Sequence, residues 1–311
     1  MTTPARALVG DAADVLERAG VASPRHDAQA LLSYVTGLSP SALMTSDPVT
    51  SEQAQAYDAL VARRASREPL QHLLGHVAFR HLDLEVGPGV FVPRPETEVM
   101  AGVAIDELRR LTASGLTEPR AVDLCTGSGA VALALATEVP GVRMTAIELS
   151  EAAVGYARRN VAAAQALVEV RHGDMADGID DLTGQVHLVT ANPPYIPLTA
   201  YESVEPEVRD HDPALALWSG DDGLDAIRVV SDVAARLLVD GGLVACEHAD
   251  AQGESASAVF AGIGLWREVR DHGDLAGRSR FVTARRVRRP TRAAPSSSPA
   301  ARAEATGTMV P

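Results

Sequence analysis

The fold is decided by the stretch Ala121-Val122-Asp123-Leu124-Cys125-Thr126-Gly127-Ser128-Gly129. Its first five residues are mostly apolar and predict a buried strand over residues 121–125. Gly127 and Gly129 predict a tight turn, and the apolar residues that follow predict a helix over residues 130–139. A strand, a glycine turn and a helix in this order favour an α/β sheet whose backbone amides face a ligand at the helix N-terminus.

Strands and helices are expected to alternate through the rest of the chain. The expected strands are residues 142–147, 168–171, 187–191 and 243–247, and the expected helices are residues 150–165, 223–238 and 250–263. A Gly241-Gly242 turn is expected before the last of these strands, and residues 266–269 and 280–284 are expected to pair as an antiparallel edge hairpin. We therefore expect an α/β fold with a Rossmann-like, doubly wound and mostly parallel sheet.

The chain before this region predicts a small helical domain and a short hairpin. Apolar residues recur at helical spacing through residues 1–75, with cap signals at Ser23-Pro24, at Ser39-Pro40 and in a capping box of Thr50 with Gln53. This domain is interpreted either as a docking surface or as a stabilising appendage. We expect a β-hairpin linker over 76–95, the main domain over 96–286, and a disordered Pro-, Ser- and Ala-rich tail over 287–311.

The bulk composition is that of a soluble globular protein. The 311 residues are 46% hydrophobic and 22% charged, and no apolar run is long enough to predict a membrane span. No secretory signal is present, and Cys125 and Cys246 fall in expected strands, where they are interpreted as buried hydrophobes in a reducing compartment. We therefore expect a cytoplasmic protein without a metal site. The net charge of −13 argues against stable nucleic-acid binding, which requires clustered cations.

Acidic residues stand at or near the ends of the expected strands. Glu148 ends the second strand and is placed to accept both hydroxyls of a ribose. Asp174 ends the third strand and could accept from an adenine amino group, with Met175 packing on the ring. Asp123 is an unusual acid for a buried strand and would suit a cationic ligand reached through water or the backbone. The alternatives are a satisfied buried acid for Asp123 and a solvated helix-start acid for Glu148.

Asn192-Pro193-Pro194-Tyr195 follows the fourth expected strand. The two prolines exclude both ladder pairing and a helix there, so the chain leaves the sheet stiffly. Asn192 is thereby held at the carboxyl end of a strand, where open α/β sheets bind ligands. Its amide can pair edge-on with another planar amide or amino group, which predicts recognition of a planar nitrogen. A turn closed by Asn-Pro is the alternative for these residues taken alone.

Together these stretches resemble the class I methyltransferases that use S-adenosylmethionine. In that family the glycine turn holds the methionine end, the second-strand acid holds the ribose and the third-strand acid meets the adenine. Asn-Pro-Pro-Tyr resembles the subset that methylates planar nitrogens, which includes DNA adenine, RNA guanine and protein glutamine enzymes. The resemblance implies catalytic roles for Asn192, Pro193, Pro194 and Tyr195. It implies a cofactor site of Asp123, Cys125, Thr126, Gly127, Ser128, Gly129, Glu148, Asp174, Met175 and Asn192.

Three further stretches are similar to one family within this subset. They are Arg67-Glu68-Pro69-Leu70-Gln71-His72-Leu73-Leu74-Gly75, Phe91-Val92-Pro93-Arg94-Pro95-Glu96-Thr97-Glu98, and Glu247-His248 followed by Gln252-Gly253. They resemble the HemK/PrmC family, the release factor glutamine methyltransferases, over about residues 5–285. The resemblance implies a methyltransferase catalytic domain over 96–286, a substrate-docking domain over 1–75, and an acceptor glutamine in the Gly-Gly-Gln loop of class I peptide-chain release factors. Cys125 replaces the glycine of many members, and Met175 replaces the aromatic residue of some.

Three other functions compete with this hypothesis. An adenine-specific DNA methyltransferase would share Asn192, but the acidic balance and the lack of a basic target-reading domain count against it. An NAD-dependent oxidoreductase fits the loose fingerprint Gly127-x-Gly129-x-x-Ala132 but gives no reason for the Asn-Pro-Pro-Tyr geometry. A non-enzymatic adaptor on this fold would be expected to have lost the glycine turn or Asn192, and both are present.

Overall fold

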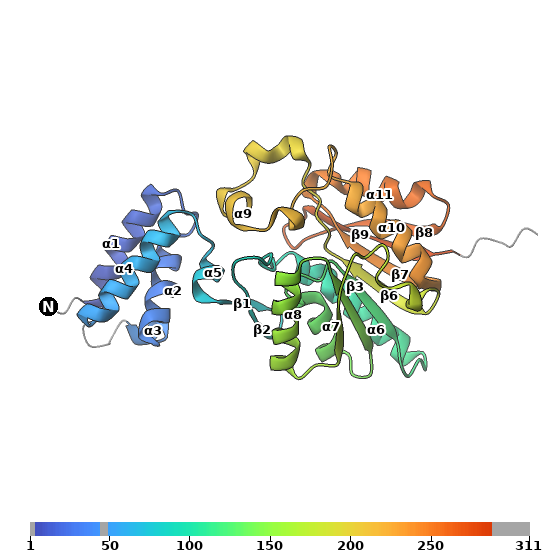
Figure 1. The fold of residues 1–311 in the computed structure, drawn as a ribbon, viewed down its shortest axis with the longest axis horizontal. Helices are drawn as coiled ribbons and strands as arrows, with labels where there is room; N and C mark the ends of the chain where they lie inside the picture. Colours follow the sequence, from blue (N-terminus) through green and yellow to red (C-terminus); the bar gives the residue numbers. More distant parts are fainter. Residues whose placement is uncertain (1–3, 44–48, 288–311) are drawn as a thin grey trace, which may run out of the picture.

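The computed structural model describes residues 4–43 and 49–287, and the expected tail lies outside the described residues apart from Val287. Its centre is a seven-stranded sheet of order β5-β4-β3-β6-β7-β9-β8 (Figure 1). The strands are β3 Arg120–Leu124, β4 Arg143–Glu148, β5 Val168–His172, β6 Val186–Ala191, β7 Leu238–Glu247, β8 Trp266–Gly273 and β9 Ser279–Arg286. The first five run parallel, whereas β9 is antiparallel to both β7 and β8. The expected parallel sheet with an antiparallel edge hairpin is therefore confirmed.

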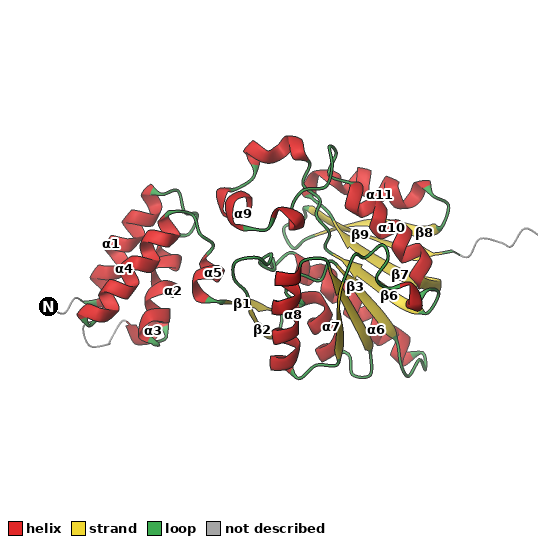
Figure 2. Cartoon of the chain, in the orientation of Figure 1, coloured by secondary structure: helices red, strands yellow, loops and turns green. Residues whose placement is uncertain are grey.

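Helices cover both faces of this sheet (Figure 2). They are α6 Thr97–Ala113, α7 Ala130–Glu138, α8 Glu151–Ala164, α10 Asp225–Leu237 and α11 Gly253–Gly262. Successive strand residues point to opposite faces, so Ala121 packs into the core under α6 and α7 while Val122 packs into the core under α10 and α11. In β6, Leu188 likewise packs under α6 and α7, and Val189 packs under α10 and α11. This alternation produces the doubly wound arrangement.

The Gly241-Gly242 pair does not form the expected turn. Strand β7 begins at Leu238, directly after α10 ends, and runs through both glycines. Its register against β6 shifts there, since Val186 pairs with Leu238 but Leu188 pairs with Leu243. A Cβ on Gly242 would lie 3.2 Å from the His187 carbonyl oxygen, so the glycine permits a bulge against the neighbouring strand.

The N-terminal region is a separate helical bundle. Its helices are α1 Ala5–Arg18, α2 Pro24–Thr36, α3 Pro40–Leu43, α4 Ser51–Ala65 and α5 Leu70–Leu74. The capping box at α4 is present. The Gln53 backbone N–H donates to Thr50 Oγ1 at 3.2 Å, and the Thr50 backbone N–H donates to Gln53 Oε1 at 3.1 Å. Ser23 precedes α2 but makes no side-chain cap bond, so that cap rests on Pro24 at the first helical position.

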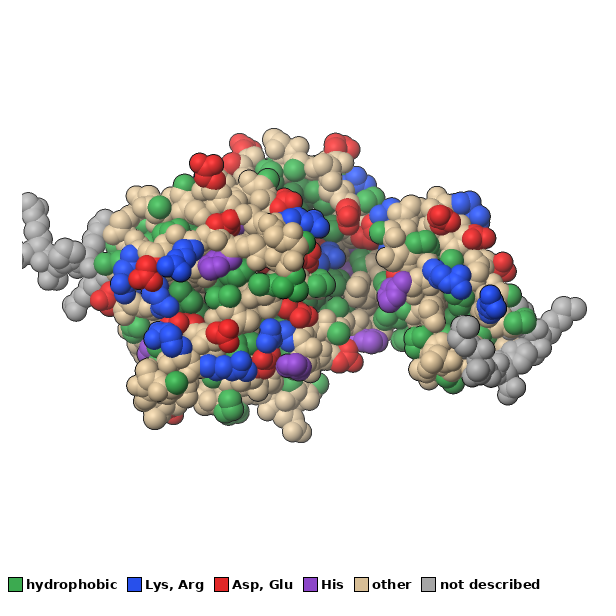
Figure 3. Space-filling model, turned by 180° about the vertical axis from the view of Figure 1, so that it is seen from behind, with side chains coloured by type: hydrophobic (Ala, Val, Ile, Leu, Met, Phe, Trp, Pro, Cys, Tyr) green, Lys and Arg blue, Asp and Glu red, His purple; other side chains and the backbone are tan. Residues whose placement is uncertain are grey.

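A short antiparallel hairpin, β1 His76–Phe79 and β2 Leu82–Glu85, follows the bundle. Phe79 and Leu84 turn into the core under α6 and α7. The hairpin expected within residues 76–95 is therefore present, and it anchors the connection between the two bodies to the sheet domain. Seen from behind, the molecule is hollowed between these bodies (Figure 3).

A buried ion cluster fixes the helical bundle against α9, Pro206–His211, in the sheet domain. Arg64 Nε donates to Asp27 Oδ2 at 2.8 Å, and Arg64 Nη2 donates to Glu207 Oε1 at 3.0 Å. Arg67 also donates to the Glu207 carboxylate and to the Gly20 carbonyl oxygen at 3.0 Å. The Arg64 side chain is 7% exposed, so one desolvated guanidinium joins three elements.

We expect Arg64→Ala to destabilise the folded protein by about 3–5 kcal/mol, because it leaves the buried Asp27 carboxylate without its partner and removes one of the two guanidinium groups that bond Glu207. Chemical denaturation measures the loss. Arg63→Ala is the matched control, since Arg63 is 52% exposed in its pair with Glu68 and such pairs contribute less than about 1 kcal/mol. Equal losses in the two variants would contradict the account of the cluster.

Candidate active site

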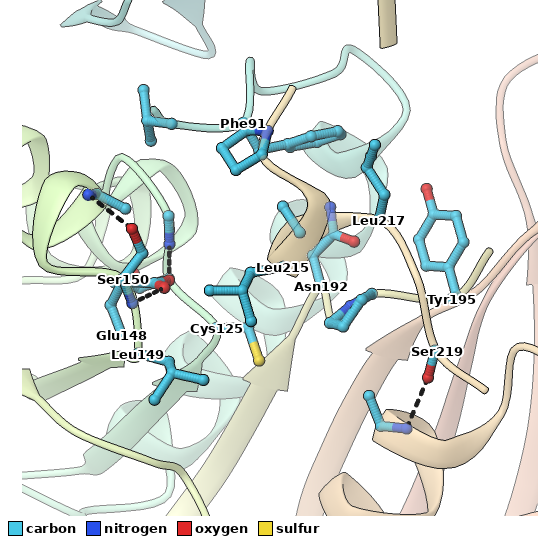
Figure 4. A pocket seen from close by; sticks show the side chains of 18 of the residues that line it. Phe91, Cys125, Glu148, Leu149, Ser150, Asn192, Tyr195, Leu215, Leu217 and Ser219 are labelled. Carbon is cyan, nitrogen blue, oxygen red and sulfur yellow. Dashed lines mark hydrogen bonds between the residues drawn. The ribbon is translucent and has the colours of Figure 1, made fainter. Parts of the chain in front are cut away.

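A cavity of about 850 Å3 opens where the parallel strands end (Figure 4). Of the residues predicted for the site, all line it except Gly129 and Pro193. Figure 4 shows Glu148 on one side and Asn192 across from it. The carboxyl ends of β3, β4, β5 and β6 supply most of these residues, as expected for an open α/β sheet.

The glycine turn forms the floor of one side. Gly127 and Gly129 have φ values of +56° and +86°, a region that residues with a Cβ rarely adopt. Gly129 is the N-cap of α7 and lies against Ala157, which explains why it does not line the cavity. A Cβ on Gly127 would meet no atom within 4 Å, so the backbone at Gly127 is open to a ligand.

Asp123 braces this turn from below. Its carboxylate accepts from Thr126 Oγ1 at 2.6 Å and from Thr190 Oγ1 at 2.7 Å, and the residue is 2% exposed. Burial raises the pKa of Asp123 to about 6, and the two hydroxyl donors act in the opposite direction. The contacts favour the alternative of a satisfied buried acid, which positions the loop by tying β3 to β6.

The sequence predicts Cys125 inside the strand, but the structure places it after the strand. Strand β3 ends at Leu124, and Cys125 takes a φ of +57° in the turn, where it lines the cavity. Its Sγ lies 3.7 Å from Met175 Sδ, so the two sulfur atoms form one soft wall. Cys246 is buried in β7 as expected. A φ of +57° is a conformation that glycine adopts without strain and that residues with a Cβ rarely adopt.

Glu148 ends β4 with both carboxylate oxygens held. Oε2 accepts from the Gly127 amide at 2.9 Å, and Oε1 accepts from the Ser150 amide at 2.8 Å. These bonds fix the carboxylate at the cavity wall and leave lone pairs on each oxygen. Such a group can accept from two neighbouring hydroxyls. The solvated helix-start alternative does not describe this arrangement, because Glu148 is half-buried and bonded to the turn.

Asp174 and Met175 lie after β5 on the same side of the cavity. Asp174 Oδ1 accepts from the Ala176 amide at 2.8 Å, which shapes the loop and leaves Oδ2 available. Met175 also packs against the core under α10 and α11. These features fit S-adenosylmethionine. The turn offers an open backbone, Glu148 offers a pair of acceptors for a ribose, and the apolar wall offers a surface for a ring.

The Asn-Pro-Pro-Tyr stretch forms the opposite side. Asn192 Nδ2 donates to Thr97 Oγ1 at 3.4 Å, and Pro194 and Tyr195 line the cavity beside it. Pro193 is buried behind them. The Tyr195 hydroxyl donates to Glu247 Oε1 at 3.4 Å, and burial raises the pKa of Tyr195, so the hydroxyl stays protonated and remains a donor.

A side-chain clamp holds the Asn-Pro-Pro-Tyr stretch from outside. Gln252 Nε2 donates to the Tyr195 carbonyl oxygen at 3.0 Å and to the Asp222 carbonyl oxygen at 3.3 Å. Gly223 packs against the same carbonyl group, with a φ of +76°. The Gln252-Gly253 stretch therefore has a positional role that its sequence alone did not reveal.

Several lining residues were not predicted as site residues. Phe91, Arg94 and Thr97 lie in the Phe91-to-Glu98 stretch, which was noted only for its resemblance. Residues 204–220 complete the wall with Val204, Glu205, Val208, Pro213, Ala214, Leu215, Ala216, Leu217, Trp218, Ser219 and Gly220. These residues form short turns, including the 3-10 helix Ala214–Ala216. Their sequence has no hydrophobic period from which a place in the cavity wall could be predicted.

The strand order, the glycine turn and Glu148 at the end of β4 define a class I S-adenosylmethionine-dependent methyltransferase. A solved structure of the hMettl16 catalytic domain in complex with the MAT2A 3'UTR hairpin 6 shares this fold, with a TM-score of 0.51 and 15% identity over 73% of this chain and 81% of that one. The family model of the PrmC N-terminal domain matches residues 7–75, and that of the Methyltransferase small domain matches residues 95–204.

The chain belongs to the release factor glutamine methyltransferase family. It is 52% identical over 281 residues to the release factor glutamine methyltransferase of Streptomyces coelicolor, covering 90% of this chain and 98% of the relative. It is 46% identical over 290 residues to that of Mycolicibacterium smegmatis, covering 92% and 99%. A 4-amino-L-phenylalanine/4-methylamino-L-phenylalanine methyltransferase of Streptomyces pristinaespiralis is 46% identical over 206 residues, covering 66% and 70%. No helix within residues 4–43 or 49–287 combines the length and apolar character that crossing a membrane requires.

Proposed function

We propose that this protein transfers a methyl group from S-adenosylmethionine to the side-chain amide nitrogen of the glutamine in the Gly-Gly-Gln motif of class I peptide-chain release factors, in the cytoplasm. Membership of the release factor glutamine methyltransferase family supports the acceptor. The observation that carries the chemistry is Asn192, which is held at the end of β6 with its Nδ2 bonded to Thr97. The Asn192 oxygen is thereby available to accept from another amide.

On the cofactor side, the residues already bonded into the turn would hold the methyl donor. The Gly127 backbone would hold the methionine end, Glu148 would accept from the ribose hydroxyls, and Asp174 with Met175 would contact the adenine; all four residues line the cavity. When bound, S-adenosylmethionine supplies a methyl group on a positively charged sulfur. Because the donor is activated in this way, the residues of the chain have to prepare the acceptor nitrogen.

The acceptor nitrogen is a poor nucleophile, because its lone pair is delocalised into the carbonyl group as in a peptide bond. If Asn192 Oδ1 and the Pro193 carbonyl oxygen accept its two hydrogens, they fix the nitrogen and enrich its lone pair. Tyr195 would pack beside the amide plane. A nitrogen fixed in this way would direct its lone pair toward the methyl group that bound S-adenosylmethionine supplies. The methylated nitrogen loses a proton to water, so no side chain is assigned as a general base.

The helical bundle over residues 1–75 is proposed to dock the protein substrate. It stands beside the cavity wall formed by residues 204–220, and the Arg64 cluster fixes it to α9 within that wall. A release factor held by the bundle would therefore present its loop to a site of defined geometry.

Transfer of labelled methyl groups tests this function. The purified chain is incubated with labelled S-adenosylmethionine and one of four acceptors: a class I release factor, its loop variant with alanine for glutamine, DNA, or 4-amino-L-phenylalanine. We expect label on the intact release factor only. Label on the loop variant or on DNA would contradict the acceptor, and label on the free amino acid alone would identify a small aromatic amine as the substrate.

A further inference from the structure

The carboxyl end of the Asn-Pro-Pro-Tyr stretch is held by the Gln252 side chain. Its Nε2 donates to the Tyr195 carbonyl oxygen at 3.0 Å and to the Asp222 carbonyl oxygen at 3.3 Å. Its Oε1 accepts from the Ala249 backbone N–H at 3.0 Å. A carbonyl oxygen can only accept and a backbone N–H can only donate, so these three bonds fix which way the amide points. Gln252 is 7% exposed and is not used by the reaction proposed above.

The loop that carries Gln252 is itself anchored by a buried histidine. The Nδ1 atom of His248 lies 2.8 Å from the Ala249 carbonyl oxygen, and its Nε2 lies 3.0 Å from Asp271 Oδ1 in β8. The histidine is fully buried. A Cβ on Gly253 would lie 2.8 Å from Asp271 Oδ2, so the glycine after Gln252 permits this close approach. The loop is therefore tied to β8, which fixes the point from which Gln252 reaches the stretch.

A glycine gives Gln252 access to the Tyr195 carbonyl group. Gly223 precedes α10 and has a φ of +76°, a conformation that residues with a Cβ rarely adopt. A Cβ at this position would overlap the Tyr195 carbonyl oxygen and would lie 2.6 Å from Gln252 Nε2. Any other residue at position 223 would therefore push the two groups apart. The hydrogen bond depends on residues from two separate segments of the chain.

The Asn-Pro-Pro-Tyr stretch has little freedom between its two anchored ends. Asn192 is held at the end of β6, and Gln252 holds the carbonyl group of Tyr195. The rings of the two prolines between these ends fix their φ angles at about −65°. The Pro193 carbonyl oxygen, the second proposed acceptor for the glutamine N–H groups, lies within this interval. Its direction is therefore set by both ends of the stretch.

We propose that Gln252 is a positioning residue for methyl transfer: by holding the Tyr195 carbonyl group, it sets the direction of the Pro193 carbonyl oxygen toward the acceptor nitrogen. The inference rests on the proposed function for its effect on turnover, because only an acceptor that brings N–H groups requires that oxygen. Without the Gln252 bond the carboxyl end of the stretch can rotate. The acceptor nitrogen is then held from the Asn192 side alone.

A single labelled peptide group reports this contact without cofactor or substrate. The chain contains five tyrosines, and only Tyr195 is followed by isoleucine. Tyrosine labelled with carbon-13 at the carbonyl, combined with nitrogen-15 isoleucine, therefore gives one coupled NMR signal, that of the Tyr195–Ile196 peptide group. We expect its carbonyl signal to move in Gln252→Met, which removes the donor at similar length, and in Gly223→Ala, which separates the two groups. The signal should stay in place in Gln165→Met, where the glutamine is exposed at the C-terminal cap of α8.

Turnover measured beside cofactor binding separates positioning from a general loss of structure. We expect Gln252→Met to lower kcat by about 10²-fold, the cost of a displacement of about 1 Å at a reacting group. Gly223→Ala, which keeps the Gln252 side chain, should lower kcat as well. The dissociation constant of S-adenosylmethionine should stay at the wild-type value, because the groups proposed to hold the cofactor lie across the cavity on the ends of β3, β4 and β5. The Gln165→Met control should match the wild-type protein in both measurements.

The outcomes distinguish this inference from the proposed function. A carbonyl signal that does not move in Gln252→Met and Gly223→Ala, or an undiminished kcat in these variants, would overturn the positioning role even if the wild-type protein methylates release factors. A parallel loss of cofactor affinity and turnover would also overturn it, since the substitution would then have disturbed the whole site. A wild-type protein that leaves release factors unlabelled would overturn the proposed function, whereas a moved carbonyl signal would still support the anchoring of the stretch by Gln252.

Discussion

Replacing Asn192 with alanine is expected to lower turnover by about 10²- to 10³-fold, as the loss of one oriented polar group does in other enzymes. The reason is geometric. Asn192 Oδ1 is held at the end of β6 by the Nδ2 bond to Thr97, so the oriented acceptor exists before the substrate arrives. Alanine removes that acceptor and leaves the glutamine nitrogen free to rotate away from the methyl group.

Binding of S-adenosylmethionine should change little in Asn192→Ala, because the groups proposed to hold it lie across the cavity on the ends of β3, β4 and β5. Single-turnover rates measure the first effect and calorimetry measures the second. Undiminished turnover in this variant would refute the role of Asn192 in holding the acceptor, and an equal loss of cofactor affinity would show that Asn192 acts chiefly through the cofactor.

Replacing Glu148 with alanine should instead weaken the binding of S-adenosylmethionine. Its two oxygens accept from the Gly127 and Ser150 amides and are proposed to accept from the ribose hydroxyls. Losing two hydrogen bonds to a charged group costs about 3 kcal/mol or more, on the order of 100-fold or more in the dissociation constant of S-adenosylmethionine. The unsupported Gly127 turn adds to this loss.

Calorimetric titration with S-adenosylmethionine measures that affinity. Glu151→Ala is the matched control, since Glu151 is an exposed acid in the first turn of α8, three residues further along. We expect its affinity to stay at the wild-type value. A dissociation constant that is the same in Glu148→Ala as in the control would refute the role of Glu148.

The features that the sequence predicted correctly are local ones. Two glycines between an apolar strand and an apolar helix permit few backbone paths, so the turn at Gly127 and Gly129 followed from composition. The prolines after Asn192 likewise restrict the chain by themselves. The same reasoning placed Glu148, Asp174 and Asn192 at one edge of the sheet, and the cavity brings these three residues together.

The features that the sequence did not predict depend on contacts between distant segments. The position of Glu247 next to Asn192 follows from the register of β6 against β7, and Thr97 reaches Asn192 only because α6 begins beside that edge of the sheet. The sequence left open whether Asp123 is a satisfied buried acid or faces a ligand, because its partner Thr190 is remote in sequence. The sequence predicts a turn at Gly241-Gly242 where the structure has a bulge, since glycines permit both and only the neighbouring strand distinguishes them.

Tandem mass spectrometry of the reaction product tests the central claim most directly. A class I release factor is incubated with this protein and S-adenosylmethionine, digested, and sequenced across its Gly-Gly-Gln loop. The account predicts a single added methyl group on the side-chain amide nitrogen of that glutamine, absent when Asn192→Ala replaces the wild-type protein. A methyl group on any other residue, or an unmodified loop, would contradict it.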